Sequence, residues 1–185
     1  MSNKIWLTSD LHFGHDREFI YSERGFKSVD DMNEQLIKNY NELIDDDDEV
    51  YILGDCSVGC DAFNSVHLIA QLKGDKHLII GNHDSDKRLD YWKSYELFNT
   101  ISFGARLIYK KRHFYLSHYP TLVANYDSWP KVWNLCGHTH TKDRFVDFDK
   151  GCYHVEVDAH GNYPVSIEQV IDDLKFKRSL LTSPH

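Results

Sequence analysis

The sequence predicts an α/β fold in which strands and helices alternate and the carboxyl ends of the strands carry a functional site. Three observations support this prediction. Short apolar runs stop just before the polar residues Asp10, Asp55 and Asn82. Segments with the apolar spacing of helices lie between these runs. The chain has 185 residues, 41% hydrophobic and 27% charged, which is typical of globular proteins, and we expect residues 1–185 to form one domain.

The first half of the chain contains three predicted strands, at residues 4–9, 50–53 and 78–80. Each is a short apolar run of the kind that suits a buried strand. Two helices are predicted between them, because apolar residues recur at helical spacing over residues 29–44 and 63–72. This alternation supports an α/β sandwich.

In the second half of the chain the apolar runs are more closely spaced. Runs typical of strands occupy residues 100–103, 105–109 and 113–117, and their spacing favours an antiparallel sheet. Two further strands are expected at residues 132–136 and 153–157.

A final helix is expected after Ser166, where apolar residues again recur at helical spacing. Gln169 lies three residues after this serine, as in a capping box. The sequence shows no internal repeat and no low-complexity linker that would mark a domain boundary.

Composition narrows the classes of partner. The net charge of -8 argues against a wide basic surface for extended nucleic acid, although bound divalent cations would make a local potential positive. No segment approaches the roughly 20 apolar residues that span a membrane, and residues 1–7 do not resemble a signal or anchor, so no membrane partner is expected. The four scattered cysteines are typical of free thiols in a reducing cytoplasm, while Cys56 and Cys60 leave a loose metal or redox pair open.

The candidate site residues lie in five short segments, each after a predicted strand. These segments are Asp10-Leu11-His12, Gly54-Asp55, Gly81-Asn82-His83-Asp84, Ser117-His118-Tyr119 and Gly137-His138-Thr139-His140. Carboxylate, amide oxygen and imidazole are ligands that catalytic metal ions favour. Two ligands at i and i+2 along extended chain point to the same side. The glycines before Asp55, Asn82 and His138 allow a sharp exit from the strand and a close approach of the backbone to ions or phosphate. One such motif is weak evidence, since Asn-His-Asp is also a common turn. The ordered set of five predicts a metal centre.

Taken together, these motifs resemble those of the calcineurin-like metallophosphoesterase superfamily. The resemblance covers the chain from Asp10 to His140, and residues 9–15, 24–26 and 164–166 are similar to small capless members from bacteria and their phages. It implies a four-layer α/β/β/α sandwich with mixed sheets. It also implies a metal-dependent phosphoester hydrolase in the cytoplasm of a bacterial cell or a phage-infected host.

The resemblance further implies two divalent metal ions, with manganese expected and iron, zinc or nickel as alternatives. The first ion would be bound by Asp10, His12, Asp55 and His140. The second would be bound by Asp55, Asn82, His118 and His138. Asp55 would therefore bridge the two ions. Such a pair lowers the pKa of a shared water, and the resulting hydroxide attacks phosphorus directly.

Three further residues are candidates for contact with the substrate. His83 fits neither ligand set, and the resemblance implies a place beside the leaving group, so we expect a general acid or transition-state donor, with a purely structural hydrogen bond as the alternative. His15 and Arg24 lie near the first ligand segment in sequence and are candidates for binding phosphate oxygens. An ordinary surface arginine explains Arg24 equally well.

The expected substrate is a small, nucleotide-like phosphodiester or phosphomonoester. Residues 55–59 lack the second Asp and the Arg of related protein phosphatases, which disfavours a phosphoprotein. Two alternatives stay open: a nuclease on short or single-stranded nucleic acid, and a catalytically inactive, metal-stabilised interaction scaffold. For a nuclease, stacking surfaces would come from Trp6, Trp92, Trp129 and Trp133. The oligomeric state is left open.

Overall fold

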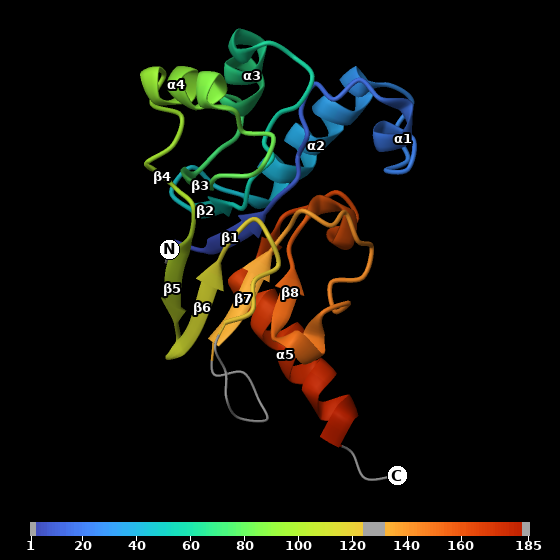
Figure 1. Cartoon of the computed structure of the whole chain (residues 1–185), viewed down its shortest axis with the longest axis vertical. Coiled ribbons are helices and arrows are strands. Elements are labelled where there is room, and N and C mark those ends of the chain that lie inside the picture. Colours follow the sequence, from blue (N-terminus) through green and yellow to red (C-terminus); the bar gives the residue numbers. More distant parts are fainter. Residues whose placement is uncertain (1–2, 124–131, 183–185) are drawn as a thin grey trace.

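Two mixed β-sheets organise the chain in a computed structural model, which describes residues 3–123 and 132–182 (Figure 1). The first sheet has the strand order β4-β3-β2-β1-β9. Its strands are β1 (Ile5–Thr8), β2 (Glu49–Ile52), β3 (Asp75–Ile79), β4 (Thr100–Ser102) and β9 (Val165–Ser166). Strands β1 to β4 run parallel to one another, whereas β9 pairs antiparallel with β1. The carboxyl ends of β1, β2 and β3 therefore meet at one edge.

The second sheet has the order β5-β6-β7-β8. Its strands are β5 (Ala105–Tyr109), β6 (Arg112–Leu116), β7 (Val132–Cys136) and β8 (Cys152–His154). Strands β5 and β6 form an antiparallel hairpin, whereas β6, β7 and β8 are parallel. The carboxyl ends of β6 and β7 thus lie together, as those of β1 to β3 do in the first sheet.

Helices cover the outer face of the first sheet, as Figure 1 shows for α2, α3 and α4. The helices of the chain are α1 (Glu18–Tyr21), α2 (Val29–Leu43), α3 (Ala62–Ile69), α4 (Asp86–Ser94) and α5 (Ile167–Thr182), with short 3-10 helices η1 (Phe148–Lys150) and η2 (Val157–His160). Ser28 caps α2 by accepting a hydrogen bond from the Asp31 N–H at 3.2 Å. Leu36 of α2 and Trp92 of α4 are buried in the same apolar cluster as Ile52. None of the helices in the described ranges is long and apolar enough to cross a membrane.

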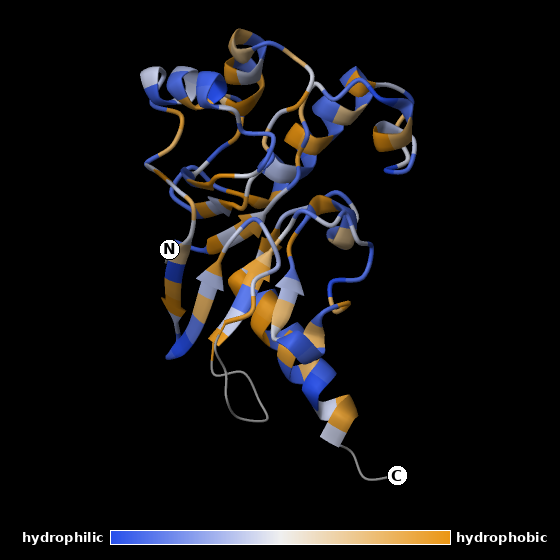
Figure 2. Ribbon diagram, viewed as in Figure 1, coloured by the Kyte–Doolittle hydropathy of each residue, from blue (hydrophilic) through white to orange (hydrophobic). Residues whose placement is uncertain are grey.

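A second apolar cluster joins the inner face of the first sheet, the second sheet and α5. It contains Leu7 of β1, Leu135 of β7 and Val170 of α5. Figure 1 shows α5 running behind the second sheet, and Figure 2 shows that apolar and polar residues alternate along it. The Tyr153 hydroxyl donates to Asp173 of α5 at 2.6 Å, which fixes the helix to β8. The order of layers is the expected α/β/β/α sandwich with mixed sheets.

The second half of the chain differs from its prediction. Strand β4 belongs to the first sheet and is parallel to β3, so the closely spaced runs at residues 100–117 do not form one antiparallel sheet. Only β5 and β6 pair antiparallel. The chain passes from one sheet to the other between Ser102 and Ala105, a step too short to show in the spacing. The strand expected at 153–157 ends at His154, and η2 begins at Val157. Between them Glu156 forms an isolated bridge with Ser9 of the other layer.

Candidate metal centre

The two sheets deliver the candidate ligands to one place. Asp10 and Asp55 follow β1 and β2, and Asn82 follows β3. His118 and His138 follow β6 and β7 of the second sheet. Because neighbouring parallel strands end at the same edge, each sheet contributes a row of polar side chains, and the rows face one another.

The backbone at the ligands is left-handed. Positive φ angles between 51° and 76° are found at Asp10, His12, Asp55, His138 and His140. Residues other than glycine adopt this conformation rarely, although Asp and His are among those enriched in it, and such strain gathers at functional sites. The expectation that the i and i+2 ligands converge along extended chain is therefore wrong in its geometry. The side chains do converge, but through left-handed turns.

Two glycines allow backbone and ligand to lie in close contact. A Cβ atom added at Gly137 would lie 2.3 Å from Oδ2 of Asp10, and one added at Gly81 would lie 2.2 Å from Oδ1 of Asp55. Both distances are shorter than side chains tolerate. Glycine is therefore required at both positions for the backbone to pack against the two carboxylates, and the predicted approach of this backbone to ions or phosphate stays a prediction.

Asp10, His12 and His140 form the first potential metal site. The Nε2 atoms of His12 and His140 lie 3.8 Å and 3.7 Å from Oδ1 of Asp10. Oδ1 of Asp10 and Nε2 of His12 are buried without a hydrogen-bond partner among the described residues. A buried polar atom without a partner costs free energy, and a cation between these atoms would supply the missing interaction. The donor set therefore fits a divalent metal ion.

Asp55 lies between this site and a second one. Its Oδ2 atom is 3.5 Å from Nε2 of His12 and 3.6 Å from Nε2 of His118. Nε2 of His118 also lies 2.9 Å from Oδ1 of Asn82 and 3.2 Å from Nδ1 of His138. One carboxylate oxygen of Asp55 thus lies within 3.6 Å of imidazole nitrogens from both halves of the candidate ligand set.

The tautomer of His118 suits metal binding. Its Nδ1 atom lies 2.8 Å from the Leu53 carbonyl oxygen, which can only accept a hydrogen bond. Nδ1 must therefore carry the proton, and in the neutral ring Nε2 keeps its lone pair for a metal ion.

The carboxylates of the centre are held in their charged form. Burial by itself raises the pKa of Asp10, but its interactions with His12, His140 and His118 bring that pKa below the ordinary value. The pKa of Asp55 is lowered in the same way, against burial, by His12 and by the His83 N–H. Both side chains are therefore anionic at neutral pH, as metal ligands should be.

Comparison with known proteins identifies the family of the chain. Residues 3–182 match the model of a family described as calcineurin-like phosphoesterase. The chain belongs to this family. It is 33% identical, over 91% of its length and 89% of the relative's, to an uncharacterized protein of Methanocaldococcus jannaschii. It is 30% identical to the gene 66 protein of Mycobacterium phage L5, over 93% of this chain and 94% of the relative.

A solved structure supports the fold. The crystal structure of a protein of unknown function from Aquifex aeolicus superposes with a TM-score of 0.70 and 25% identity, over 94% of this chain and all of that chain. As a calcineurin-like phosphoesterase, the chain is a phosphoester hydrolase of a metal-dependent family. Two groups of its candidate ligands lie close enough together to hold a metal ion.

His83 and His15 border the centre without joining either ligand group. The His83 N–H donates to Oδ1 of Asp55 at 2.8 Å, and its ring lies 5.4 Å from that of His12. Nδ1 of His15 lies 2.9 Å from Nδ1 of His12, and the two rings stack. Burial and the nearby His12 lower the pKa of His15 to about 4, so its ring is neutral near pH 7. Their roles as proton donor and phosphate contact stay predictions.

Arg24 points into the fold. Its Nη2 atom donates to the Asp10 carbonyl oxygen at 2.8 Å, and its Nη1 donates to that of Leu11 at 3.1 Å. Its side chain also pairs with Asp158 at 2.8 Å and is almost completely buried. This placement does not support the predicted phosphate contact, because the donors already face protein acceptors.

Asp84 belongs to the Asn82 motif, but the sequence pattern alone indicates no role for it. Its carboxylate accepts hydrogen bonds from the N–H groups of Gly81, Asp55 and Cys56 at 2.8 to 3.1 Å. Burial, with the nearby Asp55 charge, raises the pKa of Asp84 to about 6. Asp84 therefore ties the segments after β2 and β3 together, and its place two residues after Asn82 was the signal available in the sequence.

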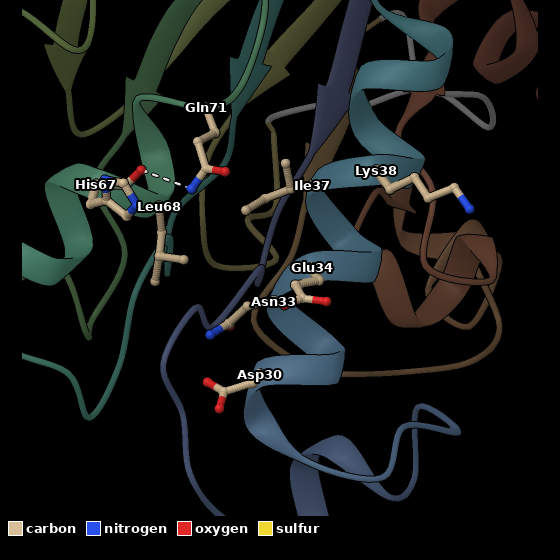
Figure 3. A pocket seen from close by; sticks show the side chains of 8 residues that line it. All are labelled: Asp30, Asn33, Glu34, Ile37, Lys38, His67, Leu68 and Gln71. Atoms are coloured by element: carbon tan, nitrogen blue, oxygen red, sulfur yellow. Dashed lines mark hydrogen bonds between the residues drawn. The ribbon is translucent and has the colours of Figure 1, made fainter.

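The centre does not coincide with the hollow between α2 and α3. This cavity, of about 480 Å³, is lined by residues such as Asn33, Glu34, His67 and Gln71 (Figure 3). None of the candidate ligands lines it. The candidate ligands lie instead at the edge where the strands of both sheets end.

Proposed function

We propose that the chain is a dinuclear-metal phosphoester hydrolase that acts on a small, nucleotide-like ester. The observation that carries the proposal is the position of Asp55 Oδ2, within 3.6 Å of imidazole nitrogens from both sites. When bound, two divalent cations, with manganese the expected pair, would activate a shared water and polarise the phosphoryl oxygens. Asp55 would hold both ions, and His83 would donate a proton to the leaving oxygen.

Two exposed aromatic rings support a substrate that carries a ring. Tyr119 is 50% exposed, and its ring lies 5.1 Å from that of His118 and 4.6 Å from that of His138. Phe19 is 62% exposed, and its ring lies 6.2 Å from that of His15, on the side of the first site. Aromatic surfaces of this kind bind nucleobases by stacking. A nucleoside ester could therefore contact protein on either side of its phosphate.

The alternatives receive less support. Trp6 and Trp92 are buried in the core, Trp133 packs against Phe148, and Trp129 lies outside the described residues, so the stacking surface suggested for a nuclease is not supported by the described tryptophans. An inactive scaffold would be expected to lack ligands, whereas every expected ligand is present.

The state of the cysteines is consistent with the reducing cytoplasm that we propose as the location of the protein. All four cysteines are free, and burial raises the pKa of Cys56, which disfavours a reactive pair with Cys60.

The test is hydrolysis of bis-p-nitrophenyl phosphate by metal-free protein to which Mn²⁺ is added, together with the metal content per chain. We expect two ions per chain and turnover that depends on them. Asp55→Asn should lower kcat by at least about 100-fold because it weakens the bridge. Asp172→Asn, which changes a carboxylate that is 68% exposed, is the matched control and should behave as wild type. The proposal would be refuted if the wild-type chain bound no divalent metal. Full activity of the Asp55→Asn variant would refute it as well.

A further inference from the structure

A segment that begins at the last residue of β8 lies directly behind the loop that carries His138 and His140. Its side chains at alternate positions, His154, Glu156 and Asp158, are buried or nearly so, and all three make polar contacts with that loop or its support. The N–H of Val157 donates to the Ser9 carbonyl oxygen at 3.2 Å, so the segment also contacts the loop that carries Asp10.

Asp158 fixes the ring of His140. Its Oδ2 atom lies 2.9 Å from Nδ1 of His140. Because an ionised carboxylate only accepts hydrogen bonds, Nδ1 carries the proton in this contact. Nε2 of His140 then keeps its lone pair and faces Oδ1 of Asp10 at 3.7 Å, toward the first metal site. This contact sets both the tautomer and the ring orientation that metal binding requires.

Arg24 fixes Asp158 in turn. Its Nε and Nη2 atoms donate to the two carboxylate oxygens at 2.9 Å and 2.8 Å, which is a bidentate pair. The same guanidinium donates to the carbonyl oxygens of Asp10 and Leu11. One buried arginine therefore connects the carboxylate behind His140 with the backbone of the other ligand loop, and it compensates the charge that the fold buries.

Glu156 constrains the loop on both sides of His140. Its Oε1 atom accepts from the Thr139 hydroxyl at 2.9 Å and from the Thr141 N–H at 3.1 Å. Thr139 lies between His138 and His140, so these contacts constrain the chain on both sides of His140. Rotation of the loop would break them along with the contact to Asp158.

We propose that Asp158 is a positioning residue that orients His140 toward the first metal ion, and that Arg24 serves this purpose instead of binding phosphate. The proposal rests on the proposed function, because its test compares metal ions bound at two sites. It predicts that the two sites respond differently, because Asp158 contacts a ligand of the first site alone.

The test is calorimetric titration of metal-free protein with Mn²⁺, which needs no turnover. Asp158→Asn keeps the size of the side chain but removes the charge that holds the Nδ1 proton. We expect the affinity of one site to fall about 10- to 100-fold, as is usual when such a supporting carboxylate is lost, while the other site stays within about three-fold. Absorption of the Co²⁺-loaded protein should change as well, because it reports ligand geometry at the ion.

Asp173→Asn is the matched control. Asp173 is also a buried carboxylate with an arginine partner, Arg144 at 3.3 Å, but it contacts α5 and β8 and not the centre. A general loss of stability would affect both variants, whereas loss of positioning affects only Asp158→Asn. If Asp158→Asn does not fold, Arg24→Lys provides the test, because lysine keeps the charge but loses the bidentate contact, and it should weaken the same site.

Wild-type affinity and an unchanged Co²⁺ spectrum in a folded Asp158→Asn or Arg24→Lys would overturn the positioning role. Equal weakening of both sites would overturn it too. A wild-type chain that binds no metal would instead refute the proposed function, and with it the role of Asp158, so the two failures are distinguished by the protein in which they occur.

Discussion

A methyl group at Gly81 would displace the Asp55 carboxylate, the proposed bridging ligand, without removing any ligand. In Gly81→Ala the new Cβ atom would lie 2.2 Å from Oδ1 and 2.5 Å from the backbone nitrogen of Asp55, whereas ordinary contact begins near 3.4 Å. Because the second clash is with backbone, the Asp55 backbone and the carboxylate that it carries must both shift, by about 1 Å. This shift strains the hydrogen bonds that Asp84 accepts from the N–H groups of Gly81 and Asp55. A displacement of that size at a reacting centre costs about 100-fold in rate, or about 2.7 kcal/mol of barrier.

The assay is kcat/KM for bis-p-nitrophenyl phosphate at saturating Mn²⁺, with folding monitored by circular dichroism. Gly104→Ala is the control, because its Cβ atom would meet the hydroxyl end of Tyr115 at 2.6 Å, and that end can move. It should retain activity within about three-fold, which corresponds to well under 1 kcal/mol. Near-wild-type activity of a folded Gly81→Ala, or an equal loss in Gly104→Ala, would show that the geometry does not control the reaction.

Three other variants test separate parts of the structure. His83→Ala should lose at least about 100-fold in kcat while binding the same amount of metal, since proton transfer contributes that much; unchanged kcat would exclude the donor role. Tyr119→Leu should lower kcat/KM for thymidine 5'-p-nitrophenyl phosphate by about ten-fold relative to methyl p-nitrophenyl phosphate, because stacking on a base is lost; an unchanged ratio would exclude a nucleobase contact. The third variant, His154→Gln, tests the pH dependence of stability. Burial lowers the pKa of His154, but Glu156 and Asp147 raise it more, so the pKa lies above the ordinary 6.5. The free energy of unfolding should therefore fall as pH rises above 6.5, because the native state keeps its proton longer, and urea titrations in EDTA should show a flatter profile for His154→Gln. Equal slopes would contradict this.

The convergence of the ligands was predictable because α/β folds place strand ends together. Asp10, Asp55 and Asn82 each follow a strand of one sheet, and their motifs are local in sequence. The left-handed backbone that directs His12 and His140 was not predictable from the i and i+2 pattern, since that pattern fits extended chain equally well.

Two features could not be predicted, because both depend on contacts between segments that are distant in sequence. They are the sheet to which β4 belongs and the side chains that support the metal ligands. Pairing of β4 with β3, rather than with β5, depends on packing between distant segments and not on local spacing. Asp158 pairs with Arg24 across 134 positions of sequence, and nothing near either residue marks the contact. The helix α4 was missed because only Leu89 and Trp92 of its nine residues are buried, which gives a short and incomplete apolar pattern.

The origin of the ligands in two different sheets has a mechanical consequence. Asp10 and Asp55 extend from one layer of the sandwich, and His118 and His138 extend from the other. Cations held between them would cross-link the layers, so metal occupancy and the docking of the sheets are thermodynamically coupled. Saturation at about 100 times Kd would add about 2.7 kcal/mol to the stability of the docked state. A chelator would then lower the melting temperature of the whole sandwich, while exposed elements such as α1 would be affected only indirectly.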